Sequence, residues 1–209
     1  MVRSGPTVDV QLPQSPVPIF PLPGVFLFPH QVLPFHIFEP RYRQMVGDLL
    51  DGPGRLCIGT VLVGEKEAPE HPPKMLEVAG LGEILRHEKL PDGRYNIWVL
   101  GLSRVRIEEA PSDRLYRQVR CLPFDEIEVA ASEDRELAAQ LRSATSARLS
   151  QPLPLPDSAP AGLLADLLVQ TLRAPQPFVE RVFAEPSIAE RARLVLERAH
   201  AADGEAPLG

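Results

Sequence analysis

The residues best suited to chemistry lie in one short run of this chain, which contains His36 and Arg41. A histidine can act as a general base near neutral pH when a carboxylate or a hydroxyl nucleophile lies beside it. The sequence places no such aspartate or serine partner for His36. Two roles stay open for its ring, a hydrogen bond to a backbone carbonyl or contact with a ligand. Arg41 has two roles as well, an ion pair with a nearby carboxylate or, with Tyr42, the border of a peptide groove.

The motifs of common enzyme classes are missing from the sequence. It has no phosphate-binding G-x-x-x-x-G-K-[ST] loop, no G-x-S-x-G elbow, no H-E-x-x-H zinc motif and no glycine-rich dinucleotide fingerprint. Two widely spaced cysteines cannot supply a zinc site of the Cys₄ type, and no pair of histidines has ligand spacing. We therefore predict that the chain is not an enzyme, has no catalytic residue and binds no cofactor or metal.

The two cysteines, Cys57 and Cys121, both lie in apolar segments of strand length. Free cysteine is among the most buried residue types and behaves as a small apolar side chain. We expect two buried, reduced thiols, with a disulfide between them as the alternative.

The elements that must position these residues are organised around the stretch from Val17 to Leu50. Its first half interleaves prolines with apolar side chains. Since proline has no backbone N–H, this half cannot be one long helix or an uninterrupted central strand. We expect short strands, the second of which turns Leu33, Phe35 and Ile37 to one face and His36 to the other.

The apolar spacing becomes helical after Phe38. Pro40 suits the first position of a helix, and Glu39 before it is expected to act as an acidic cap. Gly52 and its neighbours predict the end of this helix. A sharp strand-to-helix corner therefore follows His36 in the sequence.

The remaining sequence separates into a strand-rich part and a helical part. Further strands are expected over 55–63, 77–90, 94–109 and 116–127, with a hairpin turn at 90–94 and Trp98 in the core. About six strands with one early helix predict a partly open β-barrel over residues 1–130. Residues 131–209 are expected to form a helical subdomain, with helices near 132–149, 160–173, 176–184 and 187–201. The predicted fold class is α+β.

Composition sets further limits. The chain of 209 residues has a net charge of −6, which disfavours binding to a phosphate backbone. Its first sixteen residues contain no basic region followed by an apolar one, and no apolar run approaches the roughly 20 residues of a membrane span. We expect a cytoplasmic protein without nucleic-acid or membrane partners, as a monomer or weak dimer.

A family resemblance is carried by the run PIFPLPGVFLFP followed by LPFHIFEPRYR, and more weakly by LPDGRYNI, GLSRVRI and ERVFAEPSIAERARLVLE. In this order and spacing, these segments resemble the amino-terminal, substrate-binding domain of the Lon protease family, especially the small stand-alone bacterial proteins built from it. The resemblance extends from about Val17 to His200. It implies a PUA-like pseudo-barrel, without the ATPase and peptidase domains that Lon proteases add to it.

The resemblance and the missing motifs together predict a module that recognises protein and performs no bond chemistry. Its partners would be unfolded or apolar-rich polypeptide segments, or one partner protein. The expected contact surface is the strand–helix corner, with His36, Phe38, Arg41 and Tyr42. Two alternatives stay open: an enzyme of unknown reaction that uses a cleft between the two parts, and a PUA-like RNA binder.

Overall fold

The structure is a computed structural model that describes residues 10–65, 72–151 and 155–204. Residues 1–9 at the start of the chain lie outside the described residues. The described residues up to Phe124 form one compact unit, and those from Asp125 onward form a second. Within the described ranges, every helix is too short or too polar to span a lipid bilayer.

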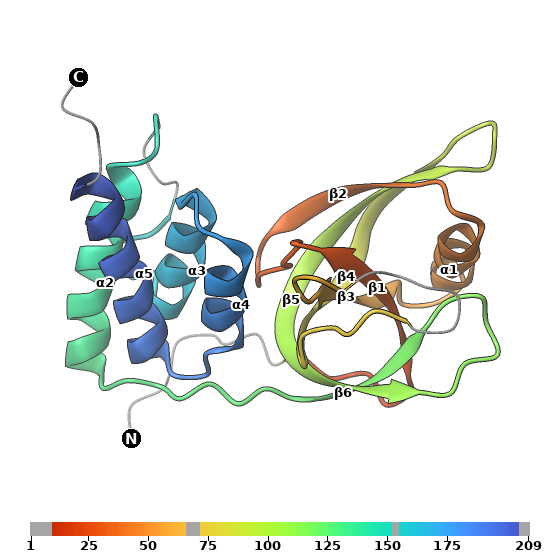
Figure 1. Cartoon of the computed structure of the whole chain (residues 1–209), viewed down its shortest axis with the longest axis horizontal. Helices are drawn as coiled ribbons and strands as arrows, with labels where there is room; N and C mark the ends of the chain where they lie inside the picture. Colours follow the sequence, from red (N-terminus) through yellow and green to blue (C-terminus); the bar gives the residue numbers. More distant parts are fainter. Residues whose placement is uncertain (1–9, 66–71, 152–154, 205–209) are drawn as a thin grey trace. The chain divides into compact units, whose positions relative to one another are not determined.

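The first unit is a mixed sheet of six strands with one helix (Figure 1). The order across the sheet is β2-β5-β4-β3-β1-β6, with β1 and β3 parallel and the other neighbours antiparallel. The elements are β1 (Val17–Pro23), β2 (Val32–Ile37), α1 (Pro40–Leu50), β3 (Arg55–Val61), β4 (Val78–Lys89), β5 (Tyr95–Ala110) and β6 (Gln118–Pro123).

The long strand β5 lets the sheet return on itself. Its first half, Tyr95 to Leu100, pairs with β2, whereas its second half, Val105 to Ala110, pairs with β6. Because β6 pairs with both β5 and β1, the sheet curls back on itself through these strands. Strand β2 pairs with β5 and lies at the end of the strand order. The predicted α+β class is therefore confirmed, with a sheet that closes only partly.

Two apolar clusters fill the two faces of the curled sheet. Strand β3 contributes to both, since side chains alternate along a strand: Leu56 and Ile58 lie in the first cluster, and Cys57 lies in the second. Helix α1 covers the first cluster with its buried residues Tyr42, Met45, Val46 and Leu49. The second cluster contains Val17, Ile19, Cys57, Ala79, Leu81, Val105 and Val119.

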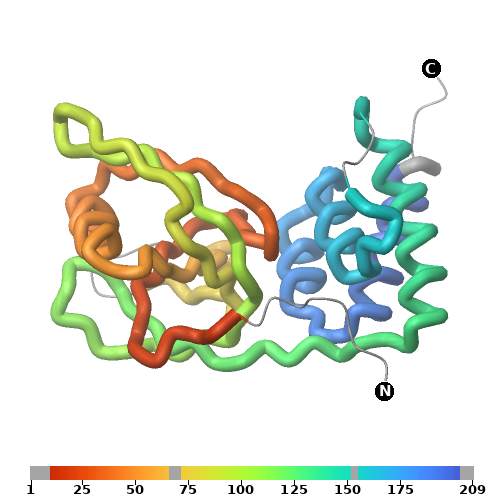
Figure 2. The backbone as a smooth tube through the Cα atoms, turned by 180° about the vertical axis from the view of Figure 1, so that it is seen from behind, coloured from red at the N-terminus to blue at the C-terminus, as the bar shows by residue number. Residues whose placement is uncertain are grey.

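The turn between β4 and β5 forms as its sequence predicts. Gly93 has a φ of 80°, in the left-handed region that favours glycine, and its N–H donates to the Leu90 carbonyl at 2.9 Å. The Arg94 N–H donates to Asp92 Oδ1 at 3.1 Å. The tip of this hairpin projects from the sheet on the side of α1 (Figures 1 and 2).

The expected core position of Trp98 is wrong. Its neighbours Ile97 and Val99 are fully buried, so alternation turns the indole to the outer face of β5, where it is half-buried. There the Arg86 guanidinium lies 4.8 Å from the centre of the indole ring, which is a cation–π contact.

The described residues of the second unit form four helices: α2 (Ala131–Ser146), α3 (Ala161–Thr171), α4 (Gln176–Ala184) and α5 (Ile188–Gly204). Helices α2, α3 and α5 lie side by side around buried leucines such as Leu141, Leu164 and Leu168 (Figures 1 and 2). Ser187 caps the start of α5, since the Glu190 N–H donates to Ser187 Oγ at 3.3 Å.

The segment before α2 belongs to this helical unit. The Ile127 N–H donates to the Pro186 carbonyl at 2.9 Å, and the Ile188 N–H donates to the Ile127 carbonyl at 3.1 Å. Glu126 adds an ion pair with Arg191 of α5 at 2.7 Å. These contacts explain why the second unit begins at Asp125 rather than at the start of α2.

Candidate functional site

The first feature of the site is the edge of β2. Strand β2 pairs with β5 on one side, and no other described strand pairs with its second side. Gly101 N–H donates to the Gln31 carbonyl at 2.8 Å, so Gln31 faces β5. By the alternation of an antiparallel pair, the backbone groups of Val32, Pro34 and His36 face the open edge. Proline is tolerated at such a position because the edge requires no donor from it.

The outer face of β2 is exposed and partly apolar. Leu33, Phe35 and Ile37 turn inward, as the sequence predicts. Val32 is 42% exposed, and Phe38, directly after the strand, is 60% exposed. An extended row of accessible apolar side chains thus runs beside unpaired backbone groups, and it is interrupted by His36.

His36 belongs to a polar network on this outer face. Its Nε2 lies 3.2 Å from Arg94 Nη1, and its Nδ1 lies 2.8 Å from Asn96 Oδ1. Since a guanidinium can only donate, Nε2 must accept and Nδ1 must carry the proton. Asn96 Nδ2 in turn donates to Glu88 Oε2 at 3.3 Å, which agrees with this assignment. The ring therefore bonds side chains from the hairpin and β5 rather than the backbone carbonyl that the sequence suggested.

Glu39 and Arg41 form an ion pair at the strand–helix corner. Arg41 Nη2 lies 2.6 Å from Glu39 Oε2, and both side chains are about one-third exposed. Glu39 occupies the cap position of α1 as expected, but its side chain makes no capping hydrogen bond to the helix. The carboxylate turns to the guanidinium instead, and the Glu39 backbone carbonyl accepts the first helical hydrogen bonds from Tyr42 and Arg43.

Tyr42 lies beneath this corner. It is only 5% exposed, and its ring centre lies 4.4 Å from that of Phe20 in the first cluster. The Arg41 guanidinium lies 4.7 Å from the centre of the Tyr42 ring. Of the four residues predicted for the contact surface, His36, Phe38 and Arg41 are therefore accessible together, while Tyr42 supports them from inside.

A hollow of about 390 Å³ lies beside the corner, between α1 and the β4–β5 hairpin. Its lining includes Arg43 from α1, and Lys89 and Tyr95 from the hairpin. Lys89 Nζ lies 5.7 Å from the centre of the Tyr95 ring. Two cations therefore border a concave surface on a chain of net charge −6. Sequence reasoning did not relate Arg43 to Lys89, because only the folded hairpin carries Lys89 back to the helix.

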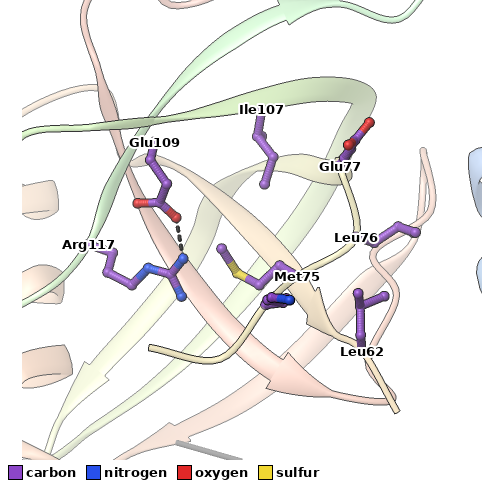
Figure 3. Close-up of a pocket in the computed structure, with 8 residues that line it drawn as sticks. Leu62, Met75, Leu76, Glu77, Ile107, Glu109 and Arg117 are labelled. Carbon is purple, nitrogen blue, oxygen red and sulfur yellow. Dashed lines mark hydrogen bonds and ion pairs between the residues drawn. The ribbon is translucent and has the colours of Figure 1, made fainter. Parts of the chain in front are cut away.

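A second hollow of about 450 Å³ lies over the second cluster (Figure 3). Leu62, Met75, Leu76 and Ile107 supply apolar side chains, and Arg117 and Glu109 form an ion pair at its rim. Lys74 and Glu77 complete the lining. These eight described lining residues include no histidine, cysteine or serine that could act as a base or a nucleophile.

Metal chemistry has no visible basis in the parts of the chain that the structure describes. They contain no group of three or more His, Cys, Asp and Glu side chains that could hold a metal ion. The site is thus an edge strand, an exposed aromatic ring and a basic hollow, arranged around one strand–helix corner.

Comparisons with known proteins agree with this architecture. The solved N-terminal domain of the Mycobacterium avium complex Lon protease is similar with a TM-score of 0.66 and 16% identity, over 89% of this chain and 98% of that one. A Lon N-terminal domain protein from Xanthomonas campestris has a TM-score of 0.61 and 19% identity, over 88% and 98% of the two chains. Such distant similarity supports the fold.

Sequence relatives extend the comparison to whole proteases. The Lon protease of Xanthomonas oryzae pv. oryzae is 31% identical over 123 residues, which cover 57% of this chain and 13% of that protein. The Lon protease of Desulfosudis oleivorans is 24% identical over 180 residues, 82% of this chain and 22% of that protein. The chain thus spans less than a quarter of the length of these relatives. Residues 16–200 match the family described as the ATP-dependent protease La (LON) substrate-binding domain, and the chain belongs to that family.

Proposed function

We propose that this chain is a non-enzymatic recognition module that binds unfolded or apolar-rich polypeptide segments at the open edge of β2. The observation that carries the proposal is the coincidence of unpaired backbone groups on β2 with exposed Val32 on the same strand and exposed Phe38 directly after it. An extended peptide can add to such an edge through backbone hydrogen bonds, while its alternate side chains contact the neighbouring surface. Backbone pairing is indifferent to sequence, which suits a protein that must accept many unfolded clients.

Each residue of the predicted contact surface has a distinct part in this proposal. Phe38 supplies apolar contact area, and its ring lies 6.3 Å from that of His36, centre to centre. His36 borders the edge with a ring already held by Arg94 and Asn96, so little side-chain entropy is lost on binding. Arg41 borders the corner, and buried Tyr42 holds its guanidinium in place.

The hollow bordered by Arg43 and Lys89 indicates which polypeptide segments should bind best. Arg43 and Lys89 would attract a carboxylate located next to the apolar segment, either an acidic side chain or a chain terminus. The client we propose is therefore an extended apolar segment flanked by negative charge. Membership of a substrate-binding domain family agrees with a role in polypeptide recognition. Because the sequence has neither a phosphate loop nor a motif of an activated nucleophile, we propose that it hydrolyses no ATP and cleaves no peptide itself.

Fluorescence anisotropy with a labelled, permanently unfolded casein tests the proposal. We expect a Kd on the order of 10 μM or weaker, because a flexible client loses conformational entropy when it binds. Phe38→Ser should weaken binding at least several-fold. Val63→Ser is the matched control, since Val63 is 61% exposed and lies outside β2. If both variants bind like the wild type, the site is wrong. If the wild type binds no unfolded polypeptide, the recognition function is wrong.

A further inference from the structure

The two cysteines of the chain meet inside the first unit. Cys57 Sγ and Cys121 Sγ lie 3.5 Å apart, and both are free thiols. They come from β3 and β6, which are not adjacent in the sheet, because β1 lies between them. The curl of the sheet brings them together, since β6 folds over the second cluster and its Cys121 is paired in register with Ile107 of β5.

We propose that Cys57 and Cys121 form a reversible disulfide when the protein meets a hydroperoxide. A disulfide requires the sulfur atoms to approach to about 2 Å. The observed separation of 3.5 Å leaves a closing movement of about 1.5 Å between the two sulfur atoms. This inference does not depend on polypeptide binding.

The two thiols differ in a way that assigns their order of reaction. Cys57 is fully buried in the second cluster, whereas Cys121 is half-buried at its margin, opposite Ile107 of the second hollow in the β5–β6 register. The hydrogen bond with Cys121, together with burial, raises the pKa of Cys57 well above its ordinary value. The hydrogen bond from Cys57 lowers the pKa of Cys121. The less buried of the two cysteines is therefore also the one whose thiol ionises first, and thiolates are the reactive form.

The chemistry has two balanced steps. The Cys121 thiolate attacks one oxygen of the peroxide, so that an S–O bond forms, the O–O bond breaks and the second oxygen leaves as water or an alcohol after protonation. The Cys57 sulfur then attacks the Cys121 sulfur of the sulfenic acid. The S–S bond forms, the S–O bond breaks, and the departing hydroxide takes up the Cys57 proton as water. Two thiols lose two electrons, which reduce one peroxide.

The proposed disulfide would reinforce the sheet where β6 meets β1. The pairing of β6 with β1 is short: it joins Val17 with Val119 and Pro18 with Gln118, and the Ile19 N–H donates to the Arg117 carbonyl at 3.0 Å beside it. A bond between Cys57 and Cys121 would join β3 to β6 across β1 and hold this weakly paired side of the sheet closed. It would also close a loop of 64 residues, and long loops lose the most unfolded-chain entropy on cross-linking.

Treatment of the intact protein with hydrogen peroxide, followed by thiol counting and peptide mass mapping, tests the inference. We expect an intramolecular Cys57–Cys121 disulfide, complete loss of free thiols, and a rise of the melting temperature on the order of 10 °C that dithiothreitol reverses. In Cys57→Ala, the sulfenic acid of Cys121 should accumulate and be trapped by dimedone. In Cys121→Ala, Cys57 should stay unmodified because it is buried.

Three results would overturn the inference: retention of both thiols in folded wild-type protein, a disulfide only between two molecules, or oxidation of Cys121 beyond the sulfenic acid without a bond to Cys57. The wild-type measurement decides among these even if an alanine variant does not fold. The substitution Cys121→Ser nearly preserves the size of the side chain and should block the bond equally.

Discussion

Arg191 Nε lies 3.2 Å from Asp166 Oδ1 inside the helical unit, and the two side chains are only 1% and 6% exposed. This contact is an ion pair, and Arg191 donates hydrogen bonds from Nη1 to Glu126 Oε1 at 2.7 Å and to the Glu185 carbonyl at 3.2 Å. One buried guanidinium therefore joins α5 to α3, to the segment before α2 and to the turn that precedes α5. This polar centre replaces apolar packing where four parts of the unit meet.

Arg191→Met should lower the free energy of unfolding of the helical unit by about 3–5 kcal/mol, because it leaves the Asp166 charge buried without its cation. Denaturant titration followed by circular dichroism measures the loss. Arg193→Met is the matched control on the same helix, since the Arg193–Glu133 pair at 2.8 Å is exposed and should contribute below about 1 kcal/mol. The double variant Arg191→Met, Asp166→Leu should recover part of the loss. Equal effects of the two single arginine variants would contradict this prediction.

Phe35→Ala should destabilise the first unit by about 3 kcal/mol, the low end for a core phenylalanine, because the ring is only partly buried. The Phe35 ring packs edge-on against Phe20, with ring centres 5.6 Å apart. The outward-facing Val32→Ala in the same strand should change stability by no more than about 0.5 kcal/mol. Chemical denaturation monitored at Trp98 gives both values. A loss below about 1 kcal/mol for Phe35→Ala would contradict the inward register of β2.

The Tyr116–Asp48 contact predicts a loss of stability in alkaline solution. Burial, aided by the hydrogen bond from Tyr116 Oη to Asp48 Oδ2 at 2.9 Å, raises the pKa of Tyr116 from 10 to about 12. A raised pKa means that folding favours the protonated phenol. The contribution of the Tyr116 side chain to the free energy of unfolding is therefore complete below pH 10 and is lost as the pH rises from 10 toward 12.

Tyr116→Phe isolates this effect from the other tyrosines. The variant should be about 1–2 kcal/mol less stable at neutral pH, because it loses a hydrogen bond to a carboxylate. The difference in the free energy of unfolding between Tyr116→Phe and the wild type should become smaller between pH 10 and about 12, as measured by urea denaturation at each pH. A difference that stays constant over this range would show that the Tyr116 pKa is not raised.

The paired substitution Arg43→Glu, Lys89→Glu should weaken binding of an apolar peptide that carries flanking aspartates by several-fold. The reason is that both cations border the hollow beside the strand–helix corner. The wild-type affinity should fall with added salt, and that dependence should be lost or reversed in the variant, because its two glutamates repel the flanking aspartates. Lys74→Glu, Arg120→Glu makes the same change of net charge elsewhere and should bind like the wild type. Equal weakening by the two pairs would assign the effect to net charge rather than to the hollow.

Much of the fold could be predicted from local pattern. The alternation of Leu33, Phe35 and Ile37 set the face of β2, Pro40 marked the first turn of α1, and Pro91-Asp92-Gly93 predicted the hairpin. These features depend on backbone conformations and periodicities that neighbouring residues impose on one another. Sequence pattern therefore reached them without knowledge of distant contacts.

Other features depend on which distant residues meet, and only the tertiary structure decided them. Trp98 is on the outer face because β5 has its buried residues at 97 and 99, and Glu39 pairs with Arg41 rather than with the helix. The contact of Cys57 with Cys121 and the hollow of Arg43 and Lys89 each need the sheet to curl or the hairpin to return. The sequence by itself determined the elements, their order and the family, because these follow from short-range preferences and motif spacing. The open edge, the thiol pair and the buried Arg191–Asp166 centre were decided by packing, which joins residues that no local pattern relates.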